Sequence, residues 1–194
     1  MKSNKIVEFG NPILRTKCKR LSNKEITSPE TQKLIQNMKS LLITERNGIG
    51  LAAPQVGRNL AIAVIAIRPT AHRPNVKEFD LVVINPEISK TFNYRKQMWE
   101  GCLSSGQGGL FAKVPRYKKV ELKYDDENGK THKKIFEGLR AHVLQHEIDH
   151  INGILFMDRV KDPITYMTLK EYKKRIVKST NRNPNSGIKY NHEP

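Results

Sequence analysis

The sequence predicts an α+β fold: several antiparallel strands, one central helix that carries a metal site, and peripheral helices toward both ends of the chain. Two observations predict it. Short β-branched runs between turn residues indicate strands, and the clearest pair forms a hairpin. Residues 138–153 combine helical spacing of apolar residues with the most chemically capable side chains of the chain, which places that helix at the centre.

The chain length and composition fit one globular domain. A chain of 194 residues with 37% hydrophobic residues can bury roughly 70% of the surface that it exposes when unfolded. We expect this domain to span residues 1–178. Residues 179–194 are polar and contain two prolines, so we expect them to form a flexible tail.

The first part of the chain is expected to be irregular, with a turn at Gly10-Asn11-Pro12, and then to form a scaffold helix. Ser28-Pro29-Glu30 predicts the start of that helix, because it offers a capping hydroxyl, a proline at the first helical position and an acid in the first turn. Asn47-Gly48 predicts its end. Residues 48–57 are too small and glycine-rich for a packed strand or a stable helix, so they predict a tight connection or a substrate-binding loop.

The middle of the chain reads as strands separated by loops. Residues 60–67, 81–84, 90–99 and 119–124 are expected as strands from β-branched runs or alternating polarity. Residues 125–129 form a turn signal, after which residues 130–136 can return as a hairpin partner. Residues 68–77 and 105–109 read as an exposed and a flexible loop.

Two further elements are expected after the central helix. Residues 154–157 are an apolar run that predicts a short strand. Residues 163–178 predict a final helix that is basic on its outer side and turns Tyr166, Leu169, Tyr172 and Ile176 inward.

The chain is strongly basic, with a net charge of +16 from 35 Lys and Arg against 19 Asp and Glu. Such a surface attracts polyanions, although a lysine-rich composition that only maintains solubility is the alternative. No motif for sequence-specific nucleic-acid binding accompanies the charge. The longest apolar run is too short to span a bilayer, and no signal core follows the first residues, so we expect a cytoplasmic protein with reduced Cys18 and Cys102.

The stretch from Gln145 to His150 carries a metal-site pattern. His146 and His150 lie four residues apart, so on a helix their imidazoles share one face. Glu147 completes the His-Glu-x-x-His pattern, in which two imidazoles hold a divalent metal and the carboxylate takes a proton from water. The alternative is a surface helix that carries two histidines by chance. A stripe that continues from Leu139 through Val143 favours the metal site, because buried histidines need partners.

A hydrolytic site of this kind usually has a third protein ligand. The candidates are Cys102, Cys18, His142 and Asp149. Asp149 points off the metal face and better fits a residue that hydrogen-bonds a ligand. Cys18 has no other ligand nearby in the sequence, whereas Cys102 lies at a strand end from which a thiolate can face the helix.

Three segments of the chain resemble the signature motifs of the peptide deformylase family. They are Gly-Ile-Gly-Leu-Ala-Ala-Pro-Gln at 48–55, Glu-Gly-Cys-Leu-Ser at 100–104 and Gln-His-Glu-Ile-Asp-His at 145–150. Their order matches, and the flanking residues 10–15 and 151–159 also resemble family sequence. The resemblance therefore covers roughly residues 5–160, and three motifs in series are highly specific.

The resemblance implies an enzyme that removes the formyl group from the N-terminal formyl-methionine of nascent polypeptides. It implies that Cys102, His146 and His150 bind the metal, commonly Fe2+, with Zn2+, Ni2+ or Co2+ as alternatives. Glu147 would act as the general base. The Gln55 side chain and the Leu103 N–H would stabilise the oxyanion.

The same resemblance implies roles for residues around the catalytic groups. Ile49, Gly50 and Gly101 would bind the substrate backbone, which would lie alongside as an added strand. Glu100 and Asp149 would hydrogen-bond the metal ligands or their neighbours. The implied setting is the bacterial cytoplasm near the ribosome, with an organellar or viral origin as the alternative.

Two features depart from the family pattern. Residues 105–109 stand where the family continues with an apolar residue and proline, which predicts an altered peptide preference. His142 lies one turn before His146, where it can rim the methionine pocket or be solvated at the helix edge, and the solvated edge is favoured.

Two other functions remain as alternatives. A zinc peptidase shares the His-Glu-x-x-His pattern, but the chain offers no convincing downstream ligand for one. A deformylase-like protein that only binds formylated or ribosomal partners fits the basic surface, but it has no chemical need for Glu147.

Overall fold

The computed structural model describes residues 5–45, 48–70, 74–106 and 109–177. Its strands form one antiparallel sheet in the order β1-β2-β3-β4-β5, and β6 pairs with β4. The strands are β1 (Gly50–Ala52), β2 (Ile62–Ile67), β3 (Phe79–Gly101), β4 (Leu110–Asp125), β5 (Thr131–Glu137) and β6 (Met167–Thr168). The expected α+β class is confirmed.

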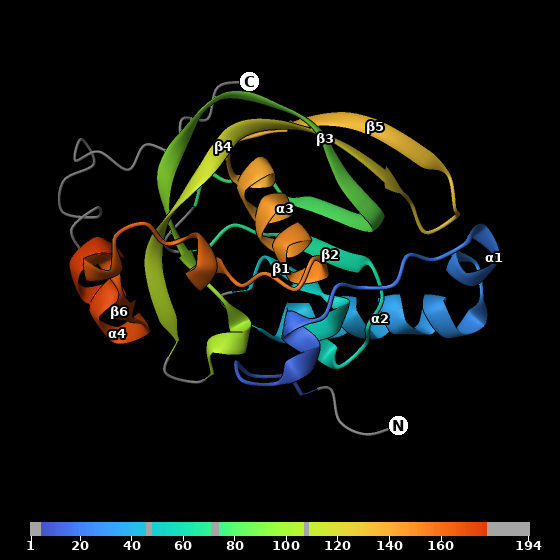
Figure 1. The fold of residues 1–194 in the computed structure, drawn as a ribbon, viewed down its shortest axis with the longest axis horizontal. Helices are drawn as coiled ribbons and strands as arrows, with labels where there is room; N and C mark the ends of the chain where they lie inside the picture. Colours follow the sequence, from blue (N-terminus) through green and yellow to red (C-terminus); the bar gives the residue numbers. More distant parts are fainter. Residues whose placement is uncertain (1–4, 46–47, 71–73, 107–108, 178–194) are drawn as a thin grey trace.

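The helix α3 (Gly138–Ile151) lies inside the curve of this sheet. Figure 1 shows β3, β4 and β5 arching over one side of α3, with β1 and β2 on the other side. Every residue from Ala141 to Ile151 is buried, so the polar residues of this helix share the interior with its apolar ones. The prediction of a central helix over 138–153 is confirmed, and its polar groups must find partners in the interior.

The prediction of two strands at 81–84 and 90–99 is wrong, because β3 is continuous across both. Register shifts at Ile84/Glu87, Ile88/Lys90 and Phe92/Arg95 bend it, as β-bulges do. Asn85, at φ 52°, sits at the first bend, where its side chain bonds the backbone N–H and C=O of Leu21. The bends let one strand pair with β2 at its start and with β4 over the rest.

The helix α2 (Pro29–Thr44) covers the face of β2 away from α3. The Ser28 hydroxyl caps it by accepting from Thr31 N, as the sequence predicts. It ends at Thr44, before the predicted Asn47-Gly48, and residues 46–47 lie outside the described residues. A short helix, α1 (Asn23–Ile26), precedes it with a Ser22–Glu25 capping box that the sequence analysis missed.

The glycine-rich stretch 48–57 is more ordered than expected. It forms the buried strand β1 and then a 3-10 turn over Ala53–Val56. Small residues suit this place because β1 is wedged between β2 and α3, where larger side chains would not fit.

Two predictions for the last described part are wrong. The apolar run 154–157 is not a strand but leads into a 3-10 turn over Phe156–Arg159. The final helix begins only at α4 (Leu169–Tyr172) and continues as a π-helix over Lys173–Val177, because β6 first pairs with Leu110 and Phe111 of β4. The predicted inward residues Tyr166, Leu169, Tyr172 and Ile176 are all partly buried. The predicted tail, 179–194, lies outside the described residues.

In the part of the chain that the structure describes, no helix has the length and apolar character needed to cross a membrane. The domain boundary expected at residue 178 stays a prediction.

Candidate active site

One cluster of possible metal ligands lies between the end of β3 and helix α3. The Cys102 Sγ and ligand nitrogens of His146 and His150 all lie within 4.8 Å of one another, and all three residues are buried. The distance from Cys102 Sγ to His150 Nε2 is 3.1 Å. Of the four candidates for a third ligand, the structure brings Cys102 to the two histidines.

Glu100, two residues before Cys102, fixes the orientation of His146. Its Oε2 lies 3.0 Å from His146 Nδ1, so the opposite ring nitrogen is free to face the thiol. Arg116 donates to both Glu100 oxygens, at 2.6 and 3.0 Å. Burial alone would raise the pKa of Glu100, but the bonds to His142 and His146 and the charge of Arg116 hold it well below the ordinary value. Glu100 is therefore an anion at the rear of the site.

His142 is not solvated at the helix edge, so that expectation is wrong. It is 6% exposed, and its Nε2 lies 2.8 Å from Glu100 Oε1. The charged carboxylate of Glu100 explains the difference, because it supplies the partner that an imidazole needs in the interior. His142 therefore joins His146 and Arg116 around one carboxylate.

Asp149 is connected to the group of Cys102, His146 and His150 only through other residues. Its Oδ2 accepts from Arg116 Nη1 at 2.6 Å, and its Oδ1 accepts from Arg159 Nη2 at 2.7 Å. Asp149 therefore acts on Arg116, which acts on Glu100, which contacts His146. The sequence analysis missed Arg116, although alternation along β4 gives the signal: Ala112, Val114 and Arg116 occupy successive inward positions.

The two histidines differ in their preferred charge without a metal. Burial lowers the pKa of His146, but hydrogen bonds to Cys102 and Glu100 outweigh it and raise the pKa well above the ordinary value. Burial and repulsion by His146 lower the pKa of His150 well below it. A metal ion needs neutral imidazoles, so an ion bound here would compete with a proton at His146.

Glu147 faces the same space from helix α3. It is 2% exposed, and its Oε2 has no hydrogen-bond partner among the described residues. Burial, with a smaller contribution from Glu100, raises its pKa to about 7. An isolated carboxyl with a pKa near neutrality is suited to accept and return a proton. A β-carbon on Gly50 would overlap the Glu147 carboxyl, so glycine lets β1 approach the base.

Gln55 presents an amide donor to the cluster. Its Oε1 accepts from Ala52 N at 2.8 Å, which fixes the amide and turns Nε2 toward Cys102 Sγ, 3.6 Å away, and Ser104 Oγ, 3.2 Å away. Leu103 begins a 3-10 turn over Leu103–Ser105, and the N–H of a first helical residue has no acceptor within its own turn. Both donors therefore lie next to the thiol.

Comparison with known proteins agrees with this geometry. The sequence model of the family described as polypeptide deformylase matches residues 3–165. The chain belongs to the polypeptide deformylase family. Peptide deformylase 2 of a Nostoc species is 34% identical over 90% of this chain and 96% of its own length. The peptide deformylase of Leptospira biflexa is 40% identical over 83% and 89%.

Solved deformylases share the fold. The Met-Ala-Ser-bound class I type b peptide deformylase of Acinetobacter baumannii superposes with a TM-score of 0.74 at 34% identity, over 80% of this chain and 96% of that one. The peptide deformylase of Synechococcus elongatus in complex with actinonin gives 0.72 at 36% identity, over 90% and 88%.

The remaining deformylase motif residues have distinct surroundings. Ile49 is partly buried against the core, and its carbonyl accepts from Ala66 N at 3.0 Å. Gly101 faces away from Cys102, and a β-carbon there would lie 2.5 Å from the Phe111 ring. Ile49 thus joins the start of β1 to β2, whereas Gly101 packs beneath an aromatic ring.

The start of the segment 105–109 is hydrogen-bonded to the cysteine. Ser105 Oγ donates to the Cys102 carbonyl at 2.6 Å and accepts from Leu110 N at 2.9 Å. Residues 107–108 lie outside the described residues. Ser105 therefore links the start of this segment to Cys102 on one side and to β4 on the other.

Proposed function

We propose that Cys102, His146 and His150 hold the metal ion with which this deformylase removes the N-formyl group from nascent polypeptides, releasing formate. The observation that carries this proposal is the convergence of the three ligand atoms within 4.8 Å, with the buried carboxyl of Glu147 on the same helix. Metal dependence is a property of the family, and these residues are the ligand set for it.

The donor set fits one divalent transition metal. Glu147 Oε2 is buried without a partner among the described residues, which is expected beside a group that completes the site, and His150 turns its Nε2 toward the Cys102 thiol. Thiolate and imidazole ligands suit Fe2+ and Zn2+ alike, and we infer Fe2+ as the native ion, with Zn2+, Ni2+ or Co2+ as substitutes. A metal held there supplies Lewis acidity, which lowers the pKa of water and polarises a carbonyl.

Glu147 is the proposed general base and acid. Its isolation in the interior keeps the carboxylate free of competing hydrogen bonds, and its raised pKa allows it to take a proton from water and return it to the departing amine. Water that loses this proton attacks the formyl carbon.

Gln55 and Leu103 are the proposed donors for the oxyanion. The Gln55 amide is held by Ala52 N, so its Nε2 is oriented before substrate arrives, and the Leu103 N–H lies next to Cys102. Preorganised donors of this kind stabilise charge that develops in the transition state.

The free edge of β1 is the proposed site for the substrate backbone. β1 pairs only with β2 in the described sheet, so its other edge has no strand partner there, and Ile49 and Gly50 lie at its start, near Glu147. A peptide added there would gain main-chain hydrogen bonds that tolerate many sequences. The Acinetobacter deformylase with bound Met-Ala-Ser supports a methionyl peptide as ligand. Gly101, covered by Phe111, would contribute through the position of the adjacent Cys102.

The proposed partners are formyl-methionyl nascent chains and, through the +16 net charge, the ribosome surface. The proposed setting is the bacterial cytoplasm. An altered peptide preference through residues 105–109, or a role limited to binding, are the alternatives.

Formate release from N-formyl-Met-Ala-Ser by anaerobically purified, Fe2+-loaded protein tests the proposal. We expect release that falls by about 10²–10⁴-fold in Glu147→Ala. Metal content of the variant, measured on the same sample, should stay at one ion per chain. An inactive wild type that holds one metal would contradict the activity, and an active Glu147→Ala variant would contradict the role of the base.

A further inference from the structure

The outward face of the β3–β4 ribbon has a composition that catalysis does not explain. Cross-strand partners in an antiparallel pair share a face, and side chains alternate along each strand. Glu100, paired with Ala112, faces α3, so the neighbouring pairs Trp99–Lys113, Arg95–Tyr117 and Phe92–Lys119 lie on the opposite face. We call these six residues, with Lys90, the ribbon face. The Tyr117 side chain also packs against the core.

Each of the three rings on the ribbon face has a cation beside it. Lys113 Nζ lies 5.4 Å from the Trp99 ring centre, and the Arg95 guanidinium lies 4.8 Å from that of Tyr117. The Phe92 ring has two cations, Lys90 at 5.0 Å and Lys119 at 5.7 Å. The rings are partly buried and the cations Lys90, Arg95 and Lys113 are exposed. Rings and cations therefore alternate along the ribbon.

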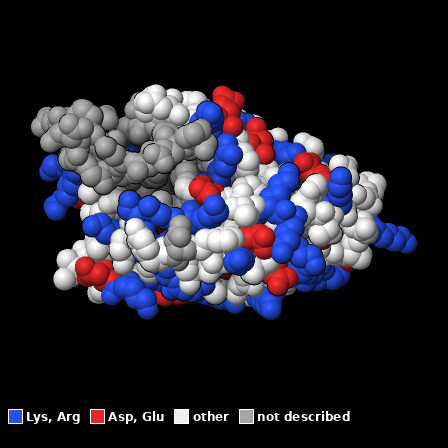
Figure 2. Space-filling view, turned by 90° about the horizontal axis from the view of Figure 1, so that it is seen from above, with Lys and Arg blue, Asp and Glu red and all other residues white. Residues whose placement is uncertain are grey.

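Most of the positive charge on this face is not neutralised within the described chain. Lys119 pairs with Glu137, but Lys90, Arg95 and Lys113 form no ion pair with any described acid. The outward acid Glu121 is the cross-strand partner of Lys90 and interacts with its charge, but it is hydrogen-bonded to Ser89 and Lys133. Figure 2, which looks onto this side of the molecule from above, shows Lys and Arg interspersed with fewer Asp and Glu.

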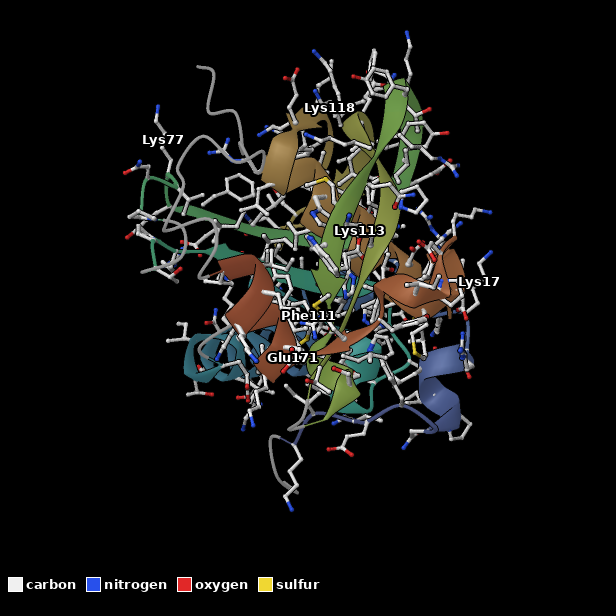
Figure 3. All side chains as sticks on the ribbon, turned by 90° about the vertical axis from the view of Figure 1, so that its left-hand side faces the viewer. Lys17, Lys77, Phe111, Lys113, Lys118 and Glu171 are labelled. Carbon is white, nitrogen blue, oxygen red and sulfur yellow. The ribbon has the colours of Figure 1, made fainter. Side chains whose placement is uncertain are left out.

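The ribbon face is separate from the catalytic groups and extends to α4. Glu100 and Arg116 use the opposite face of the same ribbon. Figure 3 shows Lys118, Lys113 and Phe111 following one another along β4, with Glu171 of α4 near Phe111. Tyr172 of α4 stacks on Phe111 and meets Trp99 edge-on, so α4 bounds the face at that end.

We propose that the ribbon face binds single-stranded RNA. Cations along a sheet neutralise successive phosphates, and aromatic rings or guanidinium planes between them stack on unpaired bases without selecting a sequence. An acidic peptide would use the charges but would leave the rings without bases to stack on. An anionic membrane is less suited, because the rings are partly buried rather than projecting into a bilayer. This inference does not depend on the catalytic assignment.

The test is fluorescence anisotropy with a labelled mixed-sequence 12-nucleotide RNA and the full chain, titrated at several salt concentrations. The face variant Lys90→Gln/Arg95→Gln/Lys113→Gln removes three charges from the ribbon face. The matched control Lys24→Gln/Lys33→Gln/Arg58→Gln removes three exposed charges on and near α1, α2 and the turn after β1. Phe92→Leu removes a ring without a change of charge.

We expect the face variant to weaken RNA binding by about tenfold or more. The slope of the logarithm of the binding constant against the logarithm of the salt concentration should fall by about 2, since each phosphate contact of a single strand contributes about 0.7 to it. The control should bind within about threefold of wild type. Phe92→Leu should lose about fivefold, the effect of one stacked base. The melting temperatures of all variants show whether each one is folded, independently of catalytic activity.

Equal losses in the face variant and the control would overturn the proposal, because net charge alone would then explain binding. Unchanged affinity in Phe92→Leu would overturn the stacking role. A second experiment measures binding to vesicles of one part phosphatidylglycerol to three parts phosphatidylcholine. A face variant that loses vesicle binding but keeps RNA binding would make the face a membrane surface and would contradict the proposal.

Discussion

Glu100 is the residue at which the buried charges of this deformylase meet. It contacts His146, a proposed metal ligand, and also Arg116 and His142, and Arg116 in turn bonds Asp149. Residues that hydrogen-bond metal ligands fix the orientation of the imidazole rings and change the affinity for the metal. The strength of metal binding is therefore set partly by residues that do not touch the metal.

His142→Leu tests this connection. The substitution removes one donor to Glu100 while keeping the volume buried, so we expect metal affinity to fall by about tenfold. Competition between the protein and a chromogenic chelator for Zn2+ measures it. His142→Gln, whose amide can donate to Glu100, should recover part of the affinity. An unchanged dissociation constant in His142→Leu would show that Glu100 needs only Arg116.

Cys18 should be an unreactive thiol, unlike an exposed cysteine. Burial raises its pKa to about 11, because the interior disfavours the thiolate. The reactive thiolate is therefore scarce at neutral pH and increases only as the pH approaches 11. In a Cys102→Ser background, the rate of alkylation by iodoacetamide should rise with a midpoint near pH 11 when folded and near the ordinary thiol value in urea. A folded-state midpoint near pH 9 would contradict the effect of burial.

Among the elements, the short strand β1 has the strictest steric requirement. It lies against helix α3, and Gly50 leaves no room for a side chain beside the Glu147 carboxyl and Val143. A glycine at this position is explained by close approach of the backbone, since no unusual φ angle is required of it.

Gly50→Ala should therefore impair catalysis more than folding. The added methyl displaces the Glu147 carboxyl, and a shift of about 1 Å at a reacting group can cost about 10²-fold in rate. Steady-state kcat/KM with N-formyl-Met-Ala-Ser measures the loss. The melting temperature of the same variant shows whether a loss of rate comes from unfolding. A folded Gly50→Ala variant with the wild-type rate would show that Gly50 does not position Glu147.

Elements with a local signal were predictable, and those set by distant contacts were not. The capping pattern at Ser28 and the turn at 125–129 specify α2 and the β4–β5 hairpin from neighbouring residues alone. The continuity of β3 depends on bulges held by Asn85 and Leu21, which are 64 residues apart. The burial of His142 depends on Glu100, 42 residues away, so the helix alone gave no indication of it.

The same distinction between local signals and distant contacts applies to the candidate active site. His146, Glu147 and His150 share a helix, so their spacing predicts the metal face. The third ligand stayed open on spacing alone, because Cys102 reaches them only through the fold, and the family resemblance was needed to select it. Arg116 and Ser104 received no role from the sequence, although both are buried at the site.

At the scale of the whole molecule, the metal should stabilise the fold, because one proposed ligand directly follows β3 and two lie on α3. A ligand at about 1,000 times its dissociation constant adds about 4 kcal/mol to the free energy of unfolding. For a chain of this size, that is about 8–16 °C in Tm. Differential scanning calorimetry with and without a chelator measures it. The same chelator should leave the Tm of a Cys102→Ser/His150→Ala variant unchanged, and a similar drop there would mean that the stabilising metal binds elsewhere.

The most direct test of the account is X-ray absorption spectroscopy of the protein loaded with one equivalent of Zn2+. We predict one sulfur ligand at about 2.3 Å and two imidazole nitrogens at about 2.0–2.1 Å, from Cys102, His146 and His150. Loss of the sulfur scatterer in Cys102→Ser would assign it. A spectrum without sulfur in the wild type, or one that Cys102→Ser leaves unchanged, would contradict the site on which the proposed function rests.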